Sequence, residues 1–284
     1  MKNFIHFFYT PFTGLGLHNG YRGDDWFRHR IGIFKNYTLQ GLLNQTNRDF
    51  THWISFRPQE KENPLVWGLH DYLGKWKDYK FIFTFGGLCF WDDKYPNDSL
   101  LERLGTTLPL LKSFADDKKA VYMTIQPSDD IYHKEAVEII QSEPYAPRKA
   151  LCFAHGYIHS IKTERLAEWN PTFPEYSPPF YTLMFPSGVF LNPQQHFDYY
   201  GLFKSHEDIP KIFNYKRLSD GKFCVLTHGQ NISTCWTSEE LKKRHFIAKI
   251  WSLLSRKSNK IQPFIGREYT GREKEKILAD FKGR

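Results

Sequence analysis

The stretch AVYMTIQPSDDIYHKEAVEIIQS, residues 120–142, joins a strand pattern to a helix pattern through an acidic turn. Residues 120–125 are mostly apolar, which is typical of a buried strand. The following apolar residues recur at helical spacing and predict a helix over residues 131–142. Asp129 and Asp130 stand between the two segments. A strand that passes through a short turn into a helix is the building unit of an α/β protein.

The same alternation precedes this stretch. Strand patterns cover residues 4–12, 51–58 and 79–86, and helix patterns cover residues 24–46, 63–76 and 99–117. Connections between parallel strands are right-handed crossovers, which place the helices on both faces of one sheet. The sequence therefore predicts an α/β fold with a mostly parallel sheet flanked by helices.

The second half of the chain has a different pattern. Residues 148–162 and 217–229 predict two longer strands. The segment between them, residues 168–193, is rich in proline and aromatic residues. Such a composition is typical of a loop over an active site, and equally of an ordered surface loop.

The C-terminal residues carry much of the positive charge of this 284-residue chain, whose formal net charge is +8. Residues 238–258 combine an amphipathic helix pattern with many lysines and arginines. Such a helix presents either a solvated face or a surface for anionic partners such as nucleotide diphosphates, nucleic acid or acidic lipids. We expect a main domain over residues 1–237 and a basic helical extension over residues 238–284.

Composition excludes several other classes of protein. The four cysteines show no CxxC spacing, which argues against a zinc ribbon or a dithiol redox site. Cys89, Cys152 and Cys224 lie in apolar runs, where cysteine behaves as a small buried hydrophobe. The amino terminus is too interrupted for a signal peptide, and no apolar run reaches the length of a transmembrane segment. We therefore expect a cytoplasmic protein with no transmembrane segment.

The acidic pair supports two interpretations. Asp129 and Asp130 follow a strand, so in a parallel sheet they should project at the edge where ligands bind. Carboxylates in that position can hold Mg²⁺ or Mn²⁺, which neutralises a diphosphate leaving group. Alternatively, Asp129 caps the helix predicted to begin near Tyr132.

Four stretches of the chain resemble the rhamnosyltransferase-like family of bacterial and phage glycosyltransferases. They are residues 26–56, 121–140, 178–196 and 225–236, of which the first, with its Gln-Thr-Asn-Arg-Asp-Phe connector, is the most specific. The resemblance covers most of residues 1–237 and implies the A-type, Rossmann-like glycosyltransferase fold (GT-A). It also implies a nucleotide-sugar donor and a divalent metal, Mn²⁺ or Mg²⁺.

The resemblance assigns roles to individual residues. Asp129 and Asp130 match the acidic motif, in which one carboxylate faces the ribose and another the metal. His228 matches a late histidine that completes the metal site, and Asn231 lies beside it. Pro127 is a departure, because the family pattern has a further acidic residue there. This difference puts metal affinity, and activity itself, in doubt.

An inverting transferase needs a general base to deprotonate the acceptor hydroxyl. In related enzymes an acidic residue at a comparable place has this role, which would fall to Asp208 or, as the alternative, to Glu207. A surface turn or a helix end is the simpler interpretation of each. A retaining enzyme would need no such base.

Donor binding is expected at the first strand and the loop that follows it. Tyr9, Thr10 and Pro11 stand at the end of this strand and could contact the nucleobase. Arg22 and Arg30 could bind phosphates with bidentate geometry, although Arg30 also fits a solvated helix position.

Three functions fit these observations. The first is transfer of a sugar from a nucleotide-sugar donor to a saccharide or lipid-linked glycan acceptor. The second keeps this chemistry but acts on hydroxymethylated bases of DNA, which the basic C-terminal tail would bind. The third is a catalytically inactive nucleotide- or sugar-binding module on the same fold, which the departure at Pro127 favours.

Overall fold

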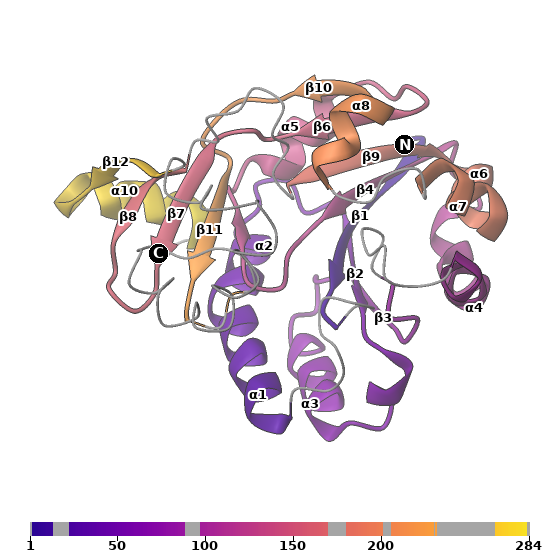
Figure 1. Ribbon diagram of the computed structural model, residues 1–284, viewed down its shortest axis with the longest axis horizontal. Coiled ribbons are helices and arrows are strands. Elements are labelled where there is room, and N and C mark those ends of the chain that lie inside the picture. The colour runs from indigo at the N-terminus through magenta and orange to yellow at the C-terminus, as the bar shows by residue number, and fades with distance from the viewer. Residues whose placement is uncertain are drawn as a thin grey trace, which may run out of the picture.

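The computed structural model describes residues 2–13, 23–88, 97–169, 180–200, 206–229, 231 and 265–282. Two sheets and the helices around them make up this part of the chain (Figure 1). The fold is α/β, with mixed sheets flanked by helices. Both the strand-and-helix alternation and the buried first strand are as the sequence predicts.

The larger sheet has seven strands in the order β10-β6-β9-β4-β1-β2-β3. Its members are β1 (Phe4–Pro11), β2 (Thr51–Ser55), β3 (Phe81–Thr84), β4 (Ala120–Ile125), β6 (Lys149–Cys152), β9 (Tyr181–Pro186) and β10 (Asn214–Arg217). β1 pairs in parallel with both β2 and β4, whereas β9 runs antiparallel between β4 and β6. The sheet is therefore mostly parallel, with one strand reversed.

The smaller sheet has five strands in the order β12-β8-β7-β11-β5. Its members are β5 (Ile131–Tyr132), β7 (Gly156–Ser160), β8 (Leu166–Trp169), β11 (Phe223–Thr227) and β12 (Ile265–Tyr269). One face packs on the larger sheet through apolar residues such as Ile158 and Val225. This sheet was not predicted from the sequence.

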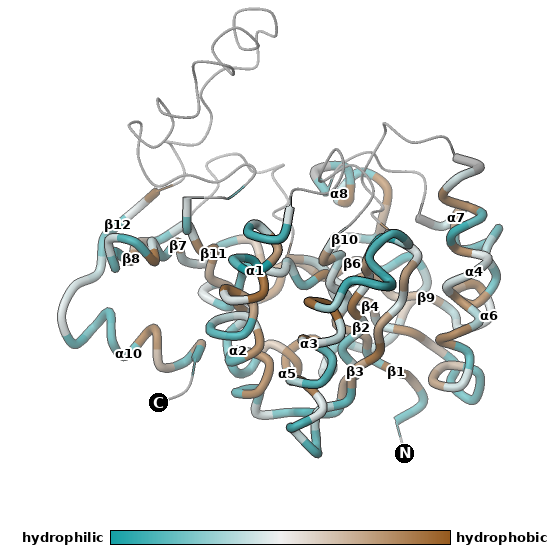
Figure 2. Tube along the Cα trace, turned by 90° about the horizontal axis from the view of Figure 1, so that it is seen from below, coloured by the Kyte–Doolittle hydropathy of each residue, from teal (hydrophilic) through white to brown (hydrophobic). Residues whose placement is uncertain are grey.

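Helices cover both faces of the larger sheet. One face carries α4 (Asn97–Ala115), α6 (Ser187–Leu191), α7 (Pro193–Tyr200), and η3 (His206–Asp208) with α8 (Ile209–Ile212). The other carries α1 (Asp24–Ile33), continued by a π-helical turn, η1 (Phe34–Thr38), and α2 (Leu39–Leu43), together with η2 (Pro58–Glu60), α3 (Pro64–Leu73) and α5 (Ala136–Ser142). In Figure 2 the central strands β1 and β9 include brown segments, in agreement with their burial between these layers.

Three secondary-structure predictions are wrong in detail. The helix predicted over residues 131–142 begins only at Ala136, because Ile131 and Tyr132 pair with β11. Asp129 therefore does not cap that helix. The strands predicted over residues 148–162 and 217–229 are each divided between the two sheets.

Where the structure describes it, the Pro-rich segment over residues 168–193 is mostly regular secondary structure: the end of β8, then β9 and α6. Its described residues from 181 to 186 form β9, in which Leu183 and Phe185 pack in the core and Pro186 ends the strand. Proline cannot donate to a sheet, so its position at the end of a strand is the expected one.

The end of the chain joins the smaller sheet. β12 pairs antiparallel with β8, and α10 (Gly271–Lys282) packs on the same sheet through Phe281, which is fully buried. Figure 1 shows both elements beside β7 and β8. The helix predicted over residues 238–258 lies outside the described residues.

Candidate functional site

A topological switch point lies between β1 and β4. On one side of β1 lie β2 and then β3. On the other side lies β4, which follows β3 in the chain. In an open α/β sheet, ligands bind beyond the carboxyl ends of the strands at such a point. Asp129 and Asp130 follow β4 at this end, four and five residues after Ile125. The fold thus places the predicted acidic pair where a ligand is expected.

Asp129 is held by two partners from distant parts of the chain. Its Oδ2 forms an ion pair with Nη1 of Arg30, on α1, and lies 3.1 Å from Nε2 of His228, which follows β11. Burial opposes ionisation of this carboxyl, but the charge of Arg30 and the hydrogen bond from His228 outweigh that effect and lower its pKa to about 2. Asp129 is therefore ionised at neutral pH.

Both ring nitrogens of His228 are engaged. The ionised Asp129 can only accept a hydrogen bond, so His228 donates from Nε2. Its Nδ1 lies 3.3 Å from Nε2 of His29, within hydrogen-bonding distance. The imidazole of His29 therefore belongs to the site. It was not predicted from the sequence.

Asn231 fixes the backbone around His228. Its Oδ1 accepts from the backbone N–H of His228 at 2.7 Å, and its Nδ2 donates to the carbonyl of Leu226 at 2.5 Å. Both ends of this buried amide brace the turn after β11. Asn231 therefore lies beside His228, and its hydrogen bonds hold the backbone of this turn.

Asp130 ties the acidic turn to the smaller sheet. Its Oδ1 accepts from the backbone N–H of Leu226 at 2.9 Å, and Nε2 of Gln126 donates to its backbone carbonyl at 3.0 Å. Burial and the neighbouring charge of Asp129 raise the pKa of Asp130 well above its usual range. The two adjacent carboxyls thus differ, and Asp129 carries the negative charge.

Several buried polar atoms near the acidic turn have no hydrogen-bond partner among the described residues. They are Nε of Arg30, Oε1 of Gln126 and Oγ1 of Thr227. Each belongs to a residue that contacts the acidic pair or adjoins His228 in the chain. Buried polar groups are rarely unpaired in folded proteins, so these three atoms are candidates for contacts with water or a polar ligand.

The site does not fit a divalent cation in this arrangement. Asp129 already contacts the guanidinium of Arg30, and His228 has no free ring nitrogen. In the part of the chain that the structure describes, no group of three or more His, Cys, Asp or Glu side chains is arranged to hold a metal ion. Asp129, Asp130 and His228 converge, but a positive side chain stands among them.

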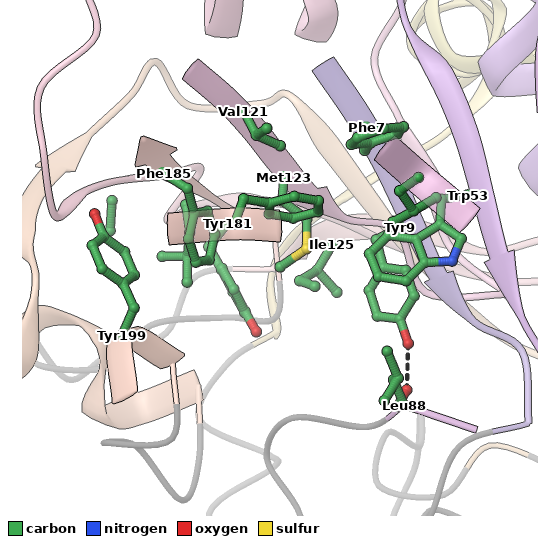
Figure 3. Close-up of a cluster of buried hydrophobic side chains, with 14 of the residues drawn as sticks. Phe7, Tyr9, Trp53, Leu88, Val121, Met123, Ile125, Tyr181, Phe185 and Tyr199 are labelled. Carbon is green, nitrogen blue, oxygen red and sulfur yellow. Dashed lines mark hydrogen bonds between the residues drawn. The ribbon is translucent and has the colours of Figure 1, made fainter. Parts of the chain in front are cut away.

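The predicted nucleobase contacts lie inside the protein. The ring of Tyr9 is fully buried against Trp53, and its hydroxyl donates to the carbonyl of Leu88 (Figure 3). Oγ1 of Thr10 is hydrogen-bonded to Nε2 of His52 at 2.8 Å. Pro11, which is also buried, ends β1. As placed, these three residues belong to the core beneath the site, while Arg22 lies outside the described residues.

The residues predicted as general base lie in a separate short helix. Glu207 and Asp208 belong to η3, just before α8. Oδ1 of Asp208 accepts from Nζ of Lys211 at 3.2 Å. Among the described contacts, none joins Asp208 to Asp129, Asp130 or His228.

A second polar cluster at the same sheet edge was not predicted. The carboxylate of Glu60 is almost fully buried and binds the guanidinium of Arg57, with Nη2 to Oε1 at 2.7 Å. The hydroxyl of Thr13, just beyond β1, donates to the other carboxylate oxygen. The spacing Arg57-x-x-Glu60 suits a local pair, but only the fold brings Thr13 to it.

Three basic side chains near the end of the chain contact other described residues. Arg267 pairs with Glu273 at 2.7 Å, Lys274 donates to the carbonyl of Glu164, and Lys282 lies over the ring of Tyr37. Among the described residues, no helix has the length and apolar character needed to cross a bilayer.

Comparison with known proteins finds only distant likenesses. No protein-family model and no curated protein sequence matches the chain. The structure of a 4-diphosphocytidyl-2C-methyl-D-erythritol synthase from Anaerococcus prevotii is 12% identical, with 87% of this chain and 96% of that chain covered and a TM-score of 0.35. The structure of a "putative nucleotide-diphospho-sugar transferase" from Desulfovibrio desulfuricans is 11% identical, with 98% and 97% covered and a TM-score of 0.34. Similarity at this level decides neither the family nor the activity.

Proposed function

We propose that the protein is a glycosyltransferase of the GT-A type, which moves a sugar from a nucleotide-sugar donor to an acceptor hydroxyl. The observation that supports this most is the convergence of Asp129, His228 and Arg30 beyond the carboxyl end of β4. A buried charged cluster at the switch point of an α/β sheet is where a nucleotide ligand is expected. The sequence likeness to rhamnosyltransferase-like proteins selects the same acidic turn and the same histidine.

The donor would bind with its diphosphate over the acidic turn. Arg30 supplies a positive charge there, which is paired with Asp129, and the buried Nε of its guanidinium has no hydrogen-bond partner among the described residues. Gln126 and Thr227 offer further unpaired polar atoms. Since the rings of Tyr9 and Trp53 fill the core below, the nucleoside would lie above the ends of the strands.

In the reaction, the bond between the anomeric carbon and the diphosphate oxygen breaks, and the acceptor oxygen bonds to that carbon. An inverting enzyme removes the proton of the acceptor hydroxyl with a general base. We propose Asp208 for this role and Glu207 as the alternative, on the basis of the sequence likeness. The proposed acceptor is a saccharide or a lipid-linked glycan.

A thermal-shift panel of UDP-, GDP-, CMP- and dTDP-linked sugars tests this function. A ligand far above its dissociation constant stabilises the folded state by a few kcal/mol, so the donor should raise the melting temperature clearly. Inorganic pyrophosphate is the control for unspecific binding of anions to a basic protein. A shift with one nucleotide class and slow release of its nucleoside diphosphate support the proposal.

Other results would favour the remaining interpretations. A shift without any turnover would indicate an inactive binding module. No shift with any nucleotide sugar would contradict the proposed function.

A further inference from the structure

Arg30 builds a permanent positive charge into the candidate site. Its side chain is only 4% exposed, although it lies on a surface helix. Nη1 contacts Oδ2 of Asp129 and makes a long hydrogen bond, 3.5 Å, to Oγ of Ser128. The guanidinium carbon lies 5.5 Å from the centre of the Trp26 ring. These contacts fix the guanidinium against the acidic turn.

The same contacts leave little opportunity for a metal ion. Oδ2 of Asp129 faces both Arg30 and His228, and Oδ1 of Asp130 accepts from Leu226. A cation at Asp129 would have to displace a buried guanidinium. Removing one partner of a buried ion pair is strongly unfavourable, because it leaves the other charge uncompensated.

We propose that Arg30 takes the place of the divalent cation, so that the protein binds a nucleoside diphosphate without Mg²⁺ or Mn²⁺. This inference rests on the proposed function and specifies how its site handles the donor. The planar guanidinium presents donors in a fork that matches two phosphate oxygens. One of these donors, Nε, is buried without a partner among the described residues. The guanidinium thus places one positive charge, paired with Asp129, where a cation would otherwise lie.

The first measurement uses the unmodified protein. UDP, GDP and dTDP are titrated calorimetrically, once with EDTA and once with Mn²⁺, and Mn²⁺ alone is titrated while its free fraction is followed by electron paramagnetic resonance. We expect one nucleotide to bind with the same affinity in EDTA and in Mn²⁺, and no binding of Mn²⁺ alone.

The second measurement uses variants of α1. Arg30→Met removes the charge, and Arg30→Lys keeps the charge but not the fork. Arg28→Met is the matched control, because Arg28 lies on the same helix, is 60% exposed and pairs only weakly with Asp24, at 3.4 Å. Loss of a hydrogen bond to a charged group predicts that Arg30→Met weakens nucleotide binding at least about tenfold, while Arg28→Met leaves it unchanged. Circular dichroism shows whether each variant is folded. Arg30→Lys should bind the nucleotide more weakly than the unmodified protein, and this comparison remains valid if Arg30→Met does not fold.

The outcomes separate the inference from the function on which it rests. Nucleotide binding that requires Mn²⁺, or equal affinity in Arg30→Lys and the unmodified protein, would overturn the inference and leave the proposed function intact. Failure of UDP, GDP and dTDP to bind in both buffers would overturn the inference, and failure of CMP-linked sugars as well would overturn the proposed function.

Discussion

Nε2 of His228 lies 3.1 Å from Oδ2 of Asp129, across 99 residues of sequence. Asp129 follows β4 of the larger sheet, whereas His228 follows β11 of the smaller one. The contact therefore forms only when the two sheets pack on each other. The site is a property of the whole fold, and changes at this junction should affect ligand binding and stability together.

Replacement of Asn231 by alanine should reduce turnover more than its effect on stability explains. The variant loses the hydrogen bonds to His228 and Leu226, which costs about 1–2 kcal/mol of stability. The backbone at His228 also loses its fixed position, and a small misplacement of a residue in a ligand site can cost up to about 100-fold in rate.

Asn63→Ala is the matched control for this prediction. Asn63 caps α3 by accepting from the backbone N–H of Leu65 at 2.9 Å, so its loss costs about 1 kcal/mol. Turnover should not change in this variant. Equal turnover in the two variants would mean that Asn231 does not position His228.

The two obvious variants of Asp130 should behave differently. Asp130→Asn keeps an oxygen that accepts from the backbone N–H of Leu226, so denaturant unfolding should show little loss of stability. Asp130→Ala leaves that buried N–H without a partner, which costs about 1–3 kcal/mol. Equal stability of the two variants would show that the hydrogen bond between Asp130 and Leu226 does not stabilise the acidic turn.

Gly41→Ala should destabilise the protein by about 1–3 kcal/mol, because overpacking forces a buried neighbour to move. A Cβ at Gly41 would lie 2.2 Å from Cγ2 of Ile131, in the strand that follows the acidic turn. Gly32→Ala is the control, since its Cβ would meet nothing within 4 Å and helix propensity favours alanine by up to about 1 kcal/mol. Chemical denaturation compares the two, and a Gly41→Ala variant as stable as the unmodified protein would contradict the close packing of α2 on β5.

Acid should destabilise the protein through two buried histidines. Burial, aided for His6 by the charge of Lys2, lowers the pKa of His6 and of His52 to about 3, from 6.5. The unfolded chain therefore takes up protons first, so stability is full above pH 6.5 and falls as the pH decreases towards 3. Between about pH 7 and about pH 5 each histidine should cost about 2 kcal/mol.

The variants His6→Gln and His52→Gln test this assignment by denaturant unfolding at the two pH values. Each should show a smaller loss of stability on acidification than the unmodified protein, by the contribution of the histidine removed. An unchanged loss in both variants would show that other groups cause the acid sensitivity.

The parts of the fold set by local periodicity could be predicted from the sequence. β1, β2, β3 and β4, together with the helices between them, follow from runs of apolar residues and helical spacing. The smaller sheet could not be predicted in this way. β5 has only two residues, and β7 and β11 belong to apolar runs that local pattern cannot assign to one sheet or the other.

The sequence singled out Asp129, Asp130 and His228 as candidates, and the structure brings Asp129 and His228 into contact, but the ion pair between Asp129 and Arg30 was not predicted. Arg30 fitted a solvated position as well as a phosphate contact, and its pairing with Asp129 depends on packing between distant segments. One signal was present in the sequence, since Arg30 stands on the same side of its helix as Trp26 and Ile33, which are buried. A charged residue on an apolar helix face indicates a buried partner.

Nuclear magnetic resonance of the histidine rings tests the central claim most directly. UDP, GDP, CMP and dTDP are added in turn to protein labelled at its histidines, with resonances assigned by single His→Gln variants. The account predicts that one nucleotide shifts the ring resonances of His228 and His29, while those of the core residues His6 and His52 stay in place. Saturable nucleotide binding that leaves His228 and His29 unchanged would contradict the claim that this site holds the donor.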